Sequence, residues 1–372
     1  PPGVVQLLPG QGETVGAQLT GDDRVRGVMF TGSTEVATLL QRNIASRLDA
    51  QGRPIPLIAE TGGMNAMIVD SSALTEQVVI DVLASAFDSA GQRCSALRVL
   101  CLQDEIADHT LKMLRGAMAE CRMGNPGRLT TDIGPVIDSE AKANIERHIQ
   151  TMRSKGRPVF QAVRENSEDA REWQSGTFVA PTLIELDDFA ELQKEVFGPV
   201  LHVVRYNRNQ LPELIEQINA SGYGLTLGVH TRIDETIAQV TGSAHVGNLY
   251  VNRNMVGAVV GVQPFGGEGL SGTGPKAGGP LYLYRLLANR PESALAVTLA
   301  RQDAEYPVDV QLKAALTQPL NALREWAANR PELQALCTQY GELAQAGTQR
   351  LLPGPTGERN TWTLLPRERV LC

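Results

Sequence analysis

The sequence contains little cysteine, little histidine and no excess of basic residues. Its five cysteines are an odd number at irregular spacings, which favours free thiols in a reducing compartment over a disulfide framework. The five histidines show no metal-ligand spacing, so we expect no metal site. A formal net charge of −7 argues against a nucleic-acid partner. The chain also lacks a membrane-length apolar run and a signal-peptide pattern, and we therefore expect a cytoplasmic protein without membrane contact.

Apolar runs and helical patterns alternate along most of the chain. The 372 residues with 42% hydrophobic content allow roughly two domains, each with its own core. The alternation is typical of βαβ units, so we expect an α/β fold with a parallel sheet. We expect strands at 25–30, 54–58, 65–69, 98–102, 178–183, 200–206, 225–230 and 248–251, and helices at 13–19, 35–48, 75–89, 105–121, 139–155, 211–220 and 234–240. Residues 164–175 are expected to form a surface loop, and helical patterns and a strand at 361–365 follow residue 291.

The loop at residues 90–96 (AGQRCSA) carries a cysteine after an expected helix and before an expected strand. A thiol is nucleophilic only as the thiolate, and Arg93 beside Cys94 is compatible with a stabilised thiolate. Taken alone, a single cysteine is more often a small buried hydrophobe. We keep that structural interpretation for Cys101 and Cys121, which lie in an expected strand and at a helix end. Cys94 is thus a candidate nucleophile that needs support from other residues.

Glu60 follows an apolar run and precedes Thr-Gly-Gly at 61–63, where glycine lets the backbone approach a ligand closely. A carboxylate at a strand end can act as a general base, although a solvated or helix-capping acid fits this position equally well. Gly32 and Ser33 follow another expected strand, and Ser33 suits the N-cap of the next helix. Ligands of open α/β folds bind at the carboxyl ends of the strands, so we expect these two sites to converge.

The glycine spacing at residues 10–16 (GQGETVG) resembles a dinucleotide-binding fingerprint with one residue too many. The pattern alone is weak, because residues 272–278 repeat the same glycine spacing with no expected strand before them. The sequence has no Gly-Lys-Ser/Thr, which excludes a P-loop. These glycines therefore indicate a nucleotide site only together with other motifs.

Taken together, five short motifs resemble the aldehyde dehydrogenase superfamily and occur in the order of that family. They are residues 30–33 (FTGS), 60–63 (ETGG), 91–94 (GQRC), 195–199 (EVFGP) and 264–267 (PFGG). The resemblance covers about residues 1–290. It implies a partial Rossmann-type NAD-binding domain at 1–62, an α/β catalytic domain at 63–270 and a return segment of the dehydrogenase fold at 271–290. Residues 291–372 would be a C-terminal extension that starts a further domain.

The resemblance also implies a mechanism and a cofactor, NAD. Cys94 would attack the aldehyde carbon to form a thiohemiacetal, a nicotinamide would accept the hydride, and Glu60 would activate the water that hydrolyses the thioester. The implied cofactor-binding residues are Gly12 and Gly16 on the adenine side, Gly32 and Ser33 near the pyrophosphate, and Glu195 and Phe197 at the nicotinamide ribose.

A narrower resemblance is to the branch that oxidises L-glutamate γ-semialdehyde, formed from 1-pyrroline-5-carboxylate, to L-glutamate in proline catabolism. In that branch a cation and a serine beside the cysteine, together with amides of a glycine loop, hold the α-carboxylate of the substrate. Residues 252–258 (NRNMVGA) match that loop. Some members carry serine in place of Ala258, so one hydrogen bond would be absent here. The implied substrate-binding residues are Arg93, Ser95, Gly257, Ala258 and Phe265.

Residues 256–261, residues 268–272 and the tail after 291 resemble the bacterial bifunctional proline-utilization flavoproteins. In those proteins an FAD-containing proline dehydrogenase domain precedes the aldehyde dehydrogenase, which implies channelling between the two, and we expect a homo-oligomer. The family's oxyanion asparagine and its adenosine-ribose lysine cannot be located in this sequence. We therefore expect a fragment with an incomplete cofactor site, weakly active or inactive alone.

Two alternatives remain open from the sequence. An acylating aldehyde dehydrogenase would pass the thioester to coenzyme A, although the retention of Glu60 favours water. A non-catalytic interaction segment of the same fold is the second alternative, and the presence of both Cys94 and Glu60 argues against it for the parent protein. The sequence does not decide between NAD and NADP.

Overall fold

The computed structural model describes residues 3–49, 51–162, 176–287, 289, 291, 318, 320–343 and 349–365. The chain divides into two compact units. The first unit comprises Pro1–Gly257 and Phe265–Lys276, and the second comprises Ala258–Pro264 and Ala277–Cys372. The surface loop expected at 164–175 lies outside the described residues.

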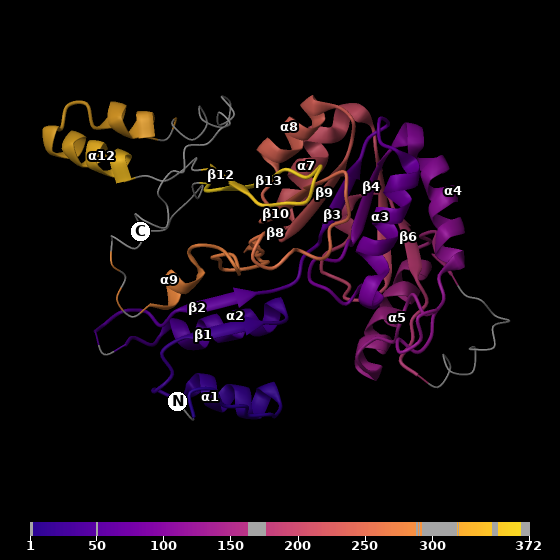
Figure 1. The fold of residues 1–372 in the computed structure, drawn as a ribbon, viewed down its shortest axis with the longest axis horizontal. Helices are drawn as coiled ribbons and strands as arrows, with labels where there is room; N and C mark the ends of the chain where they lie inside the picture. The colour runs from indigo at the N-terminus through magenta and orange to yellow at the C-terminus, as the bar shows by residue number, and fades with distance from the viewer. Residues whose placement is uncertain are drawn as a thin grey trace. The chain divides into compact units, whose positions relative to one another are not determined.

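The first unit is built around a seven-stranded sheet in the order β10-β9-β3-β4-β7-β6-β5 (Figure 1). Neighbouring strands are parallel, apart from the edge strand β5, which is antiparallel to β6. The strands are β3 (Ala66–Val69), β4 (Val99–Gln103), β5 (Val159–Gln161), β6 (Thr182–Leu186), β7 (Val200–Tyr206), β9 (Thr226–His230) and β10 (Asn248–Val251). Strands β3, β4 and β9 are buried along their whole length, as is typical of a parallel sheet covered on both faces.

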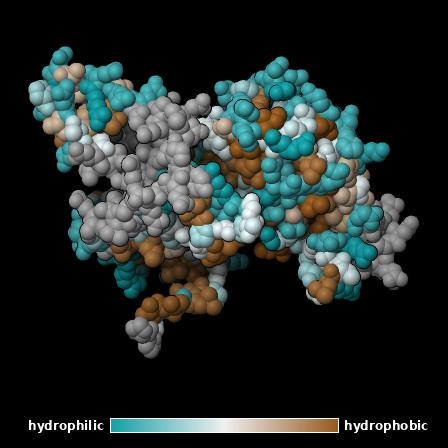
Figure 2. Space-filling model, turned by 45° about the horizontal axis from the view of Figure 1, so that its top comes forward, coloured by the Kyte–Doolittle hydropathy of each residue, from teal (hydrophilic) through white to brown (hydrophobic). Residues whose placement is uncertain are grey.

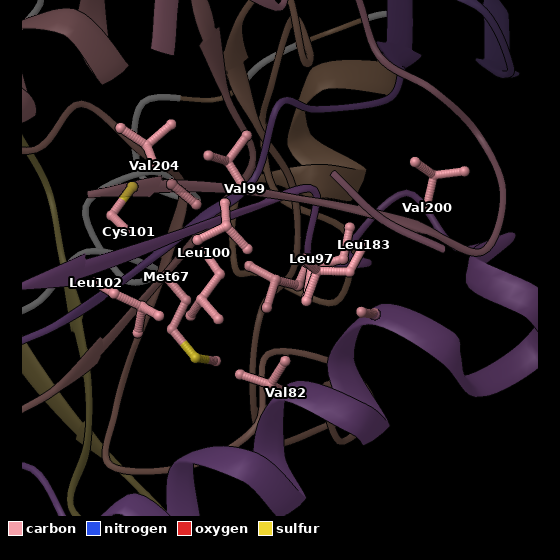
Figure 3. Packing of buried hydrophobic residues seen from close by; sticks show 14 of the residues in the cluster. Met67, Val82, Leu97, Val99, Leu100, Cys101, Leu102, Leu183, Val200 and Val204 are labelled. Atoms are coloured by element: carbon pink, nitrogen blue, oxygen red, sulfur yellow. The ribbon is translucent and has the colours of Figure 1, made fainter. Parts of the chain in front are cut away.

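Helices pack against this sheet and close its core (Figure 1). They are α3 (Thr75–Phe87), α4 (Asp104–Glu120), α5 (Ser139–Ser154), α7 (Leu211–Ala220) and α8 (Asp234–Ser243), with the 3-10 turns η2 (Asp88–Gly91), η3 (Phe189–Glu191) and η4 (Arg208–Gln210). Figure 3 shows Met67 of β3, Val82 of α3 and Leu100 of β4 in one packed cluster, and all three are fully buried. Cys101 of β4 belongs to the same core, where burial raises the pKa of its thiol to about 12. Such a thiol is inert, which agrees with the structural interpretation.

A smaller parallel sheet in the same unit pairs β1 (Val28–Thr31) with β2 (Leu57–Glu60). Its register sets Thr31 opposite Glu60, so both strands end at the same edge. Helix α2 (Thr34–Ala45) follows β1, and its N-cap Ser33 accepts a hydrogen bond from the Val36 amide at 3.2 Å. The remaining elements of the unit are the π-helical turn η1 (Gly12–Gly16), α1 (Ala17–Gly21) and the antiparallel pair β8 (Tyr223–Gly224) and β11 (Glu268–Gly269).

Part of the apolar surface of the first unit stays in contact with solvent. Met29 on β1 and Val36 and Leu39 on α2 are largely exposed. Figure 2 shows hydrophobic patches between hydrophilic areas on the face that it displays. Among the helices that the structure describes, none has the length and apolar character needed to cross a membrane.

The second unit contains α9 (Tyr282–Leu286), α12 (Pro331–Leu343) and the antiparallel hairpin of β12 (Gln349–Leu352) and β13 (Asn360–Thr363). Gln263 Nε2 donates to Asn360 Oδ1 at 3.2 Å within this unit. The guanidinium carbon of Arg350 lies 5.8 Å from the ring centroid of Trp362, which is buried. Most of the helical pattern expected directly after residue 291 lies outside the described residues.

The α/β fold with a mainly parallel sheet is confirmed, with two displaced strands. The strand expected to begin with residues 54–58 and to end at 59–60 is observed as β2, which starts only at Leu57, because Pro54 and Pro56 have no amide hydrogen for a ladder. The strand expected at 178–183 is likewise displaced to β6, which starts directly after Pro181. The short edge strands β5 and β12 were not expected.

Candidate active site

Cys94 lies on a loop with an unusual backbone, which we call the nucleophile loop (residues 88–96). In η2, at the start of this loop, Ser89 and Ala90 have φ of 55° and 54°, and Gly91 has φ of 66°. This left-handed region costs a non-glycine residue about 1–3 kcal/mol. A Cβ at Gly91 would lie 2.2 Å from a carbonyl oxygen of a neighbouring loop, so this position requires glycine. Surrounding contacts must therefore hold the loop in place.

The buried cation Arg98 supplies many of these contacts. Its guanidinium is fully buried and donates to the carbonyl oxygens of Gly91 at 2.7 Å and Arg93 at 3.0 Å. On the neighbouring loop it donates to the Gly198 carbonyl at 3.3 Å and pairs with Glu195 at 3.0 Å. Leaving one member of a buried ion pair without its partner costs about 3–5 kcal/mol. Arg98 therefore fixes the nucleophile loop against the loop that carries Glu195.

Asn65, directly before β3, holds the backbone of the nucleophile loop at Cys94 and just after it. Its Nδ2 donates to the carbonyl oxygens of Cys94 at 2.7 Å and Ala96 at 2.8 Å. Its Oδ1 accepts from the Thr226 amide at 3.2 Å. Asn65 is almost fully buried, and each such hydrogen bond contributes about 1 kcal/mol to stability. The carbonyl groups on either side of the Ser95 amide thus have fixed directions.

The thiol of Cys94 is partly buried and lies between opposing electrostatic influences. Burial is the largest effect and raises the pKa of the Cys94 thiol, and the carboxyl groups of Glu195 and Glu60 raise it further. The backbone amides of Ser95 and Cys94 lower this pKa, since they interact favourably with a thiolate. The outcome differs from the stabilised thiolate with which the neighbouring Arg93 was compatible. The resting thiol is protonated, and a base must take its proton before it can react.

Glu60 supplies a carboxyl group poised for proton transfer. Its Oε2 accepts from the Gly267 amide at 3.1 Å, and its buried Oε1 has no hydrogen-bond partner among the described residues. A Cβ at Gly266 or Gly272 would lie 3.1 or 3.0 Å from these oxygens, so the glycines leave room for the carboxyl group. Burial raises the pKa of Glu60 to about 7, opposed by the Gly267 amide and the Lys276 ammonium. A pKa near neutrality suits a general base.

Lys276 is the cation that acts on this carboxyl group. Its Nζ donates to the Gly247 carbonyl oxygen. Burial lowers the pKa of Lys276 to about 8, while the carboxyl groups of Glu268 and Glu60 raise it. The ammonium form therefore predominates below about pH 8 and favours the ionised form of Glu60.

Glu195 lies beside the end of β2 as well as beside Arg98. Its carboxyl group accepts a hydrogen bond from the Gly63 amide, and a Cβ at Gly62 would lie 1.6 Å from its Oε2. Burial raises the pKa of Glu195, and Arg98 lowers it. Phe197 on the same loop is 46% exposed, with its ring centroid 5.2 Å from the Arg98 guanidinium carbon. A carboxylate and an open aromatic face therefore lie next to the strand end that carries Glu60.

A family model described as "Aldehyde dehydrogenase family" matches residues 1–288. The chain belongs to the aldehyde dehydrogenase family. Over all 372 residues it is 99% identical to "Bifunctional protein PutA" of Escherichia coli (strain K12), and it spans 28% of the length of that protein. It is 35% identical over 285 residues to "1-pyrroline-5-carboxylate dehydrogenase" of Geobacillus kaustophilus (strain HTA426), which covers 76% of this chain and 54% of that protein.

Solved structures of aldehyde dehydrogenases agree with this assignment. A crystal structure of a bifunctional proline utilization A (PutA) protein is similar with a TM-score of 0.69 and 52% identity, covering 74% of this chain and 27% of that chain. A 1-pyrroline-5-carboxylate dehydrogenase from Thermus with bound NAD gives a TM-score of 0.69 and 38% identity, and the match covers 77% of this chain and 54% of that chain. The resemblance to the 1-pyrroline-5-carboxylate dehydrogenase branch and to the bifunctional proline-utilization proteins is thus confirmed.

The residues assigned to NAD by the aldehyde dehydrogenase resemblance lie at several places in the first unit. Gly32 and Ser33 join β1 to α2, and Ser33 is exposed. The motif of Glu195 and Phe197 lies beside the end of β2. Gly12 and Gly16 are the ends of η1; Gly12 is exposed, Gly16 is partly buried, and both have open space at the Cβ position. No cluster of metal-binding side chains occurs among the described residues.

The residues assigned to the substrate differ in accessibility. Arg93 is partly exposed, and its Nε donates to Ser89 Oγ at 3.1 Å. Ser95 is buried and Phe265 is partly buried, while Gly257 is exposed with φ of 77°. Ala258 belongs to the second unit, so its assignment stays a prediction.

Three contributors to the site were missed from the sequence: Asn65, Arg98 and Lys276. Asn65 and Arg98 were counted as parts of expected strands, and Lys276 lay in a glycine-rich segment without a clear pattern. One signal was available for Arg98, because a charged residue within an otherwise apolar run must have a partner if it is buried.

Proposed function

We propose that the protein carrying this chain oxidises L-glutamate γ-semialdehyde to L-glutamate with NAD, as part of proline catabolism. The observation that carries the proposal is the buried Glu60 carboxyl group, whose Oε1 has no hydrogen-bond partner among the described residues and which lies near enough to Cys94 to raise the pKa of its thiol. The similarity to PutA and to 1-pyrroline-5-carboxylate dehydrogenases supports the choice of substrate.

Cys94 is the nucleophile in this proposal. Its proton must leave first, because burial keeps the resting thiol protonated. Glu60, with a pKa of about 7, accepts a proton at neutral pH. The sulfur then forms a bond to the aldehyde carbon. The backbone amides of Cys94 and Ser95, which already interact with the sulfur, lie where they can stabilise the oxyanion of the thiohemiacetal.

NAD, when bound, accepts the hydride from the former aldehyde carbon, which leaves a thioester on Cys94. The chain offers suitable groups for the pyrophosphate and for the nicotinamide ribose of this cofactor. The exposed Ser33 and the amides of the first turn of α2 suit a pyrophosphate, and Glu195 with Phe197 suits the nicotinamide ribose. The full set of cofactor-binding residues in the proposal is Gly12, Gly16, Gly32, Ser33, Glu195 and Phe197.

Glu60 first releases the Cys94 proton to solvent and then acts a second time, as the base that takes a proton from water. Among the described residues its Oε1 has no hydrogen-bond partner and can accept that hydrogen bond, and the hydroxide equivalent attacks the thioester carbon. Cys94 leaves as a thiolate, which the amides of Cys94 and Ser95 stabilise, and glutamate is released. Lys276 favours the ionised form of Glu60, because its ammonium lowers the pKa of that carboxyl group.

The substrate's α-carboxylate is proposed to bind beside the nucleophile. Arg93 provides a partly exposed cation, and a cation with neighbouring N–H donors is what a carboxylate requires. The proposed substrate-binding residues are Arg93, Ser95, Gly257, Ala258 and Phe265. We further propose that the intact protein forms a homo-oligomer, which sedimentation of that protein tests. It would act in the cytoplasm and receive the aldehyde from an FAD-containing proline dehydrogenase domain.

The test uses a full-length carrier, namely the E. coli PutA relative with its matching segment replaced by these 372 residues. With glutamate semialdehyde and NAD, we expect Cys94→Ser to form no NADH. Glu60→Gln should form NADH slowly, because Cys94 has lost its base, and should stall after at most one equivalent per site, because the thioester is not hydrolysed. Continued turnover of Glu60→Gln at the unmodified rate would contradict the role of Glu60. Release of an acyl-coenzyme A product when coenzyme A is added would instead support the acylating alternative.

A further inference from the structure

Helix α3 carries three polar side chains, Gln77, Asp81 and Ser85, at intervals of four residues. Residues four apart lie on the same face of a helix, so the three form a polar row along α3. We propose that this row positions the substrate loop (residues 252–257) relative to Cys94. The inference rests on the proposed function, in which that loop helps to bind the α-carboxylate.

Successive residues of the polar row contact successive residues of the substrate loop. The contacts join Gln77 to Asn252, Asp81 to Asn254, and Ser85 to Met255. The first is a hydrogen bond of 2.7 Å from the Gln77 side chain to a loop carbonyl oxygen, and the third is one of 3.0 Å from a loop amide to the Ser85 hydroxyl. In the second, the Asp81 carboxylate accepts from a loop amide. All three bonds go to backbone atoms, so they fix the path of the loop whatever its side chains are.

Ser85 joins the substrate loop to the nucleophile loop. Its hydroxyl accepts from the Met255 amide at 3.0 Å, and its own carbonyl oxygen accepts from the Leu97 amide at 2.9 Å. Leu97 follows directly after the nucleophile loop that carries Cys94. Ser85 is 1% exposed and Met255 is fully buried, so water cannot replace either bond. Ser85 therefore connects the substrate loop to the end of the nucleophile loop through two buried hydrogen bonds.

Other contacts hold the substrate loop from the sheet side. Asn252, with φ of 53°, receives a hydrogen bond from the Thr231 amide on its Oδ1 and donates from its Nδ2 to the Thr231 carbonyl oxygen, at 3.0 and 2.9 Å. The Met255 side chain occupies the space beside Gly228, where a Cβ would lie 3.0 Å from its sulfur. The loop is thus fixed as far as Met255, and the exposed Gly257 beyond it is the part left for a ligand.

Charge adds to the central contact of the row. His230 Nε2 lies 3.5 Å from Asp81 Oδ2, and burial lowers the pKa of His230 to about 4, so the imidazole is neutral. Burial raises the pKa of Asp81, while Arg253 and the Asn254 amide lower it. Asp81 therefore interacts with two groups of the substrate loop, Arg253 and the Asn254 amide, and with one neutral group of β9, His230.

The test compares two aldehydes in the full-length carrier: glutamate semialdehyde and butanal, which has no carboxylate. Gln77 is exposed, so Gln77→Met removes one loop contact without disturbing the core. We expect it to raise the KM for glutamate semialdehyde about threefold to tenfold while kcat and the KM for butanal change less than about twofold. Ser85→Ala leaves a buried amide unsatisfied and should raise the first KM by at least about fivefold. Gln77→Lys, which keeps a donor, should restore most of the loss.

Glu76→Ala is the matched control, because Glu76 is the exposed neighbour of Gln77 on α3 and should leave both substrates unaffected. If Gln77→Met changes both aldehydes equally, or neither, the positioning role of α3 is refuted even if Ser85→Ala fails to fold. If the unmodified carrier shows no preference for glutamate semialdehyde over butanal, the proposed function fails instead. The two failures are therefore distinguishable.

Discussion

Replacement of Lys276 by methionine tests whether a buried cation sets the working pH of Glu60. Glu60 acts as a base only when ionised, so activity should rise with pH through its pKa of about 7. On that basis a base with this pKa is ionised in roughly a tenth of molecules at pH 6 and in half at pH 7. Lys276 lowers the pKa of Glu60, so its removal must raise that pKa. A cation of this kind changes a carboxyl pKa by about one unit or more.

A shift of about one unit would reduce activity at pH 7 from about half to about a tenth of its plateau, roughly fivefold, and leave activity at pH 9 nearly unchanged. The assay is kcat at saturating aldehyde and NAD between pH 5.5 and 9.5, in the full-length carrier, with Lys276→Arg as the charge-retaining control. A profile that keeps its midpoint in Lys276→Met, or an equal loss at every pH, would refute the electrostatic role and indicate a structural one.

Gly91→Ala should abolish activity, since Gly91 has a left-handed backbone and no space for a Cβ. As a comparison, Gly116 lies in the middle of α4 with open space around it. Gly116→Ala should therefore raise the free energy of thermal unfolding by about 0.5–1 kcal/mol. Arg98→Met should destabilise the first unit by about 3–5 kcal/mol, because Glu195 is left without its buried partner, and limited proteolysis should reveal the opened loop; unchanged protease resistance would show that the pair is not needed. Arg93→Ala should raise the KM for glutamate semialdehyde about tenfold, with little change for butanal, and equal effects in steady-state kinetics would exclude Arg93 from carboxylate recognition.

The sequence predicted the α/β class and many elements because these depend on local patterns. Strand β7 is an almost continuous buried run and helices α7 and α3 carry buried apolar residues on one side, and their predicted ranges coincide with the observed ones or differ by two residues. Short edge strands such as β5 depend on a partner strand and carry little local signal. Proline displaced two predicted strands because its effect on the ladder was not weighed against the apolar run.

The site was predictable only where chemistry follows a short motif. Cys94 and Glu60 stood out through their glycine-rich neighbours, whereas Arg98 acts on carbonyl oxygens about a hundred residues away, at Gly198. No local pattern reveals such partners. The same holds for Gln77, whose polar character on a helix face indicates a solvated surface as readily as a contact with a loop. The protonation state of Cys94 also depends on burial, which cannot be predicted from the neighbouring Arg93 in the sequence.

The partial burial of the Cys94 sulfur has a consequence for the chemical endurance of the protein. Peroxide and other oxidants attack thiolates far faster than thiols. Burial and two carboxyl groups keep the sulfur protonated at rest, so it is a poor target for oxidants when no aldehyde is present. The proton that Glu60 must remove at the start of each cycle thus also lowers the rate at which oxidants react with the resting sulfur.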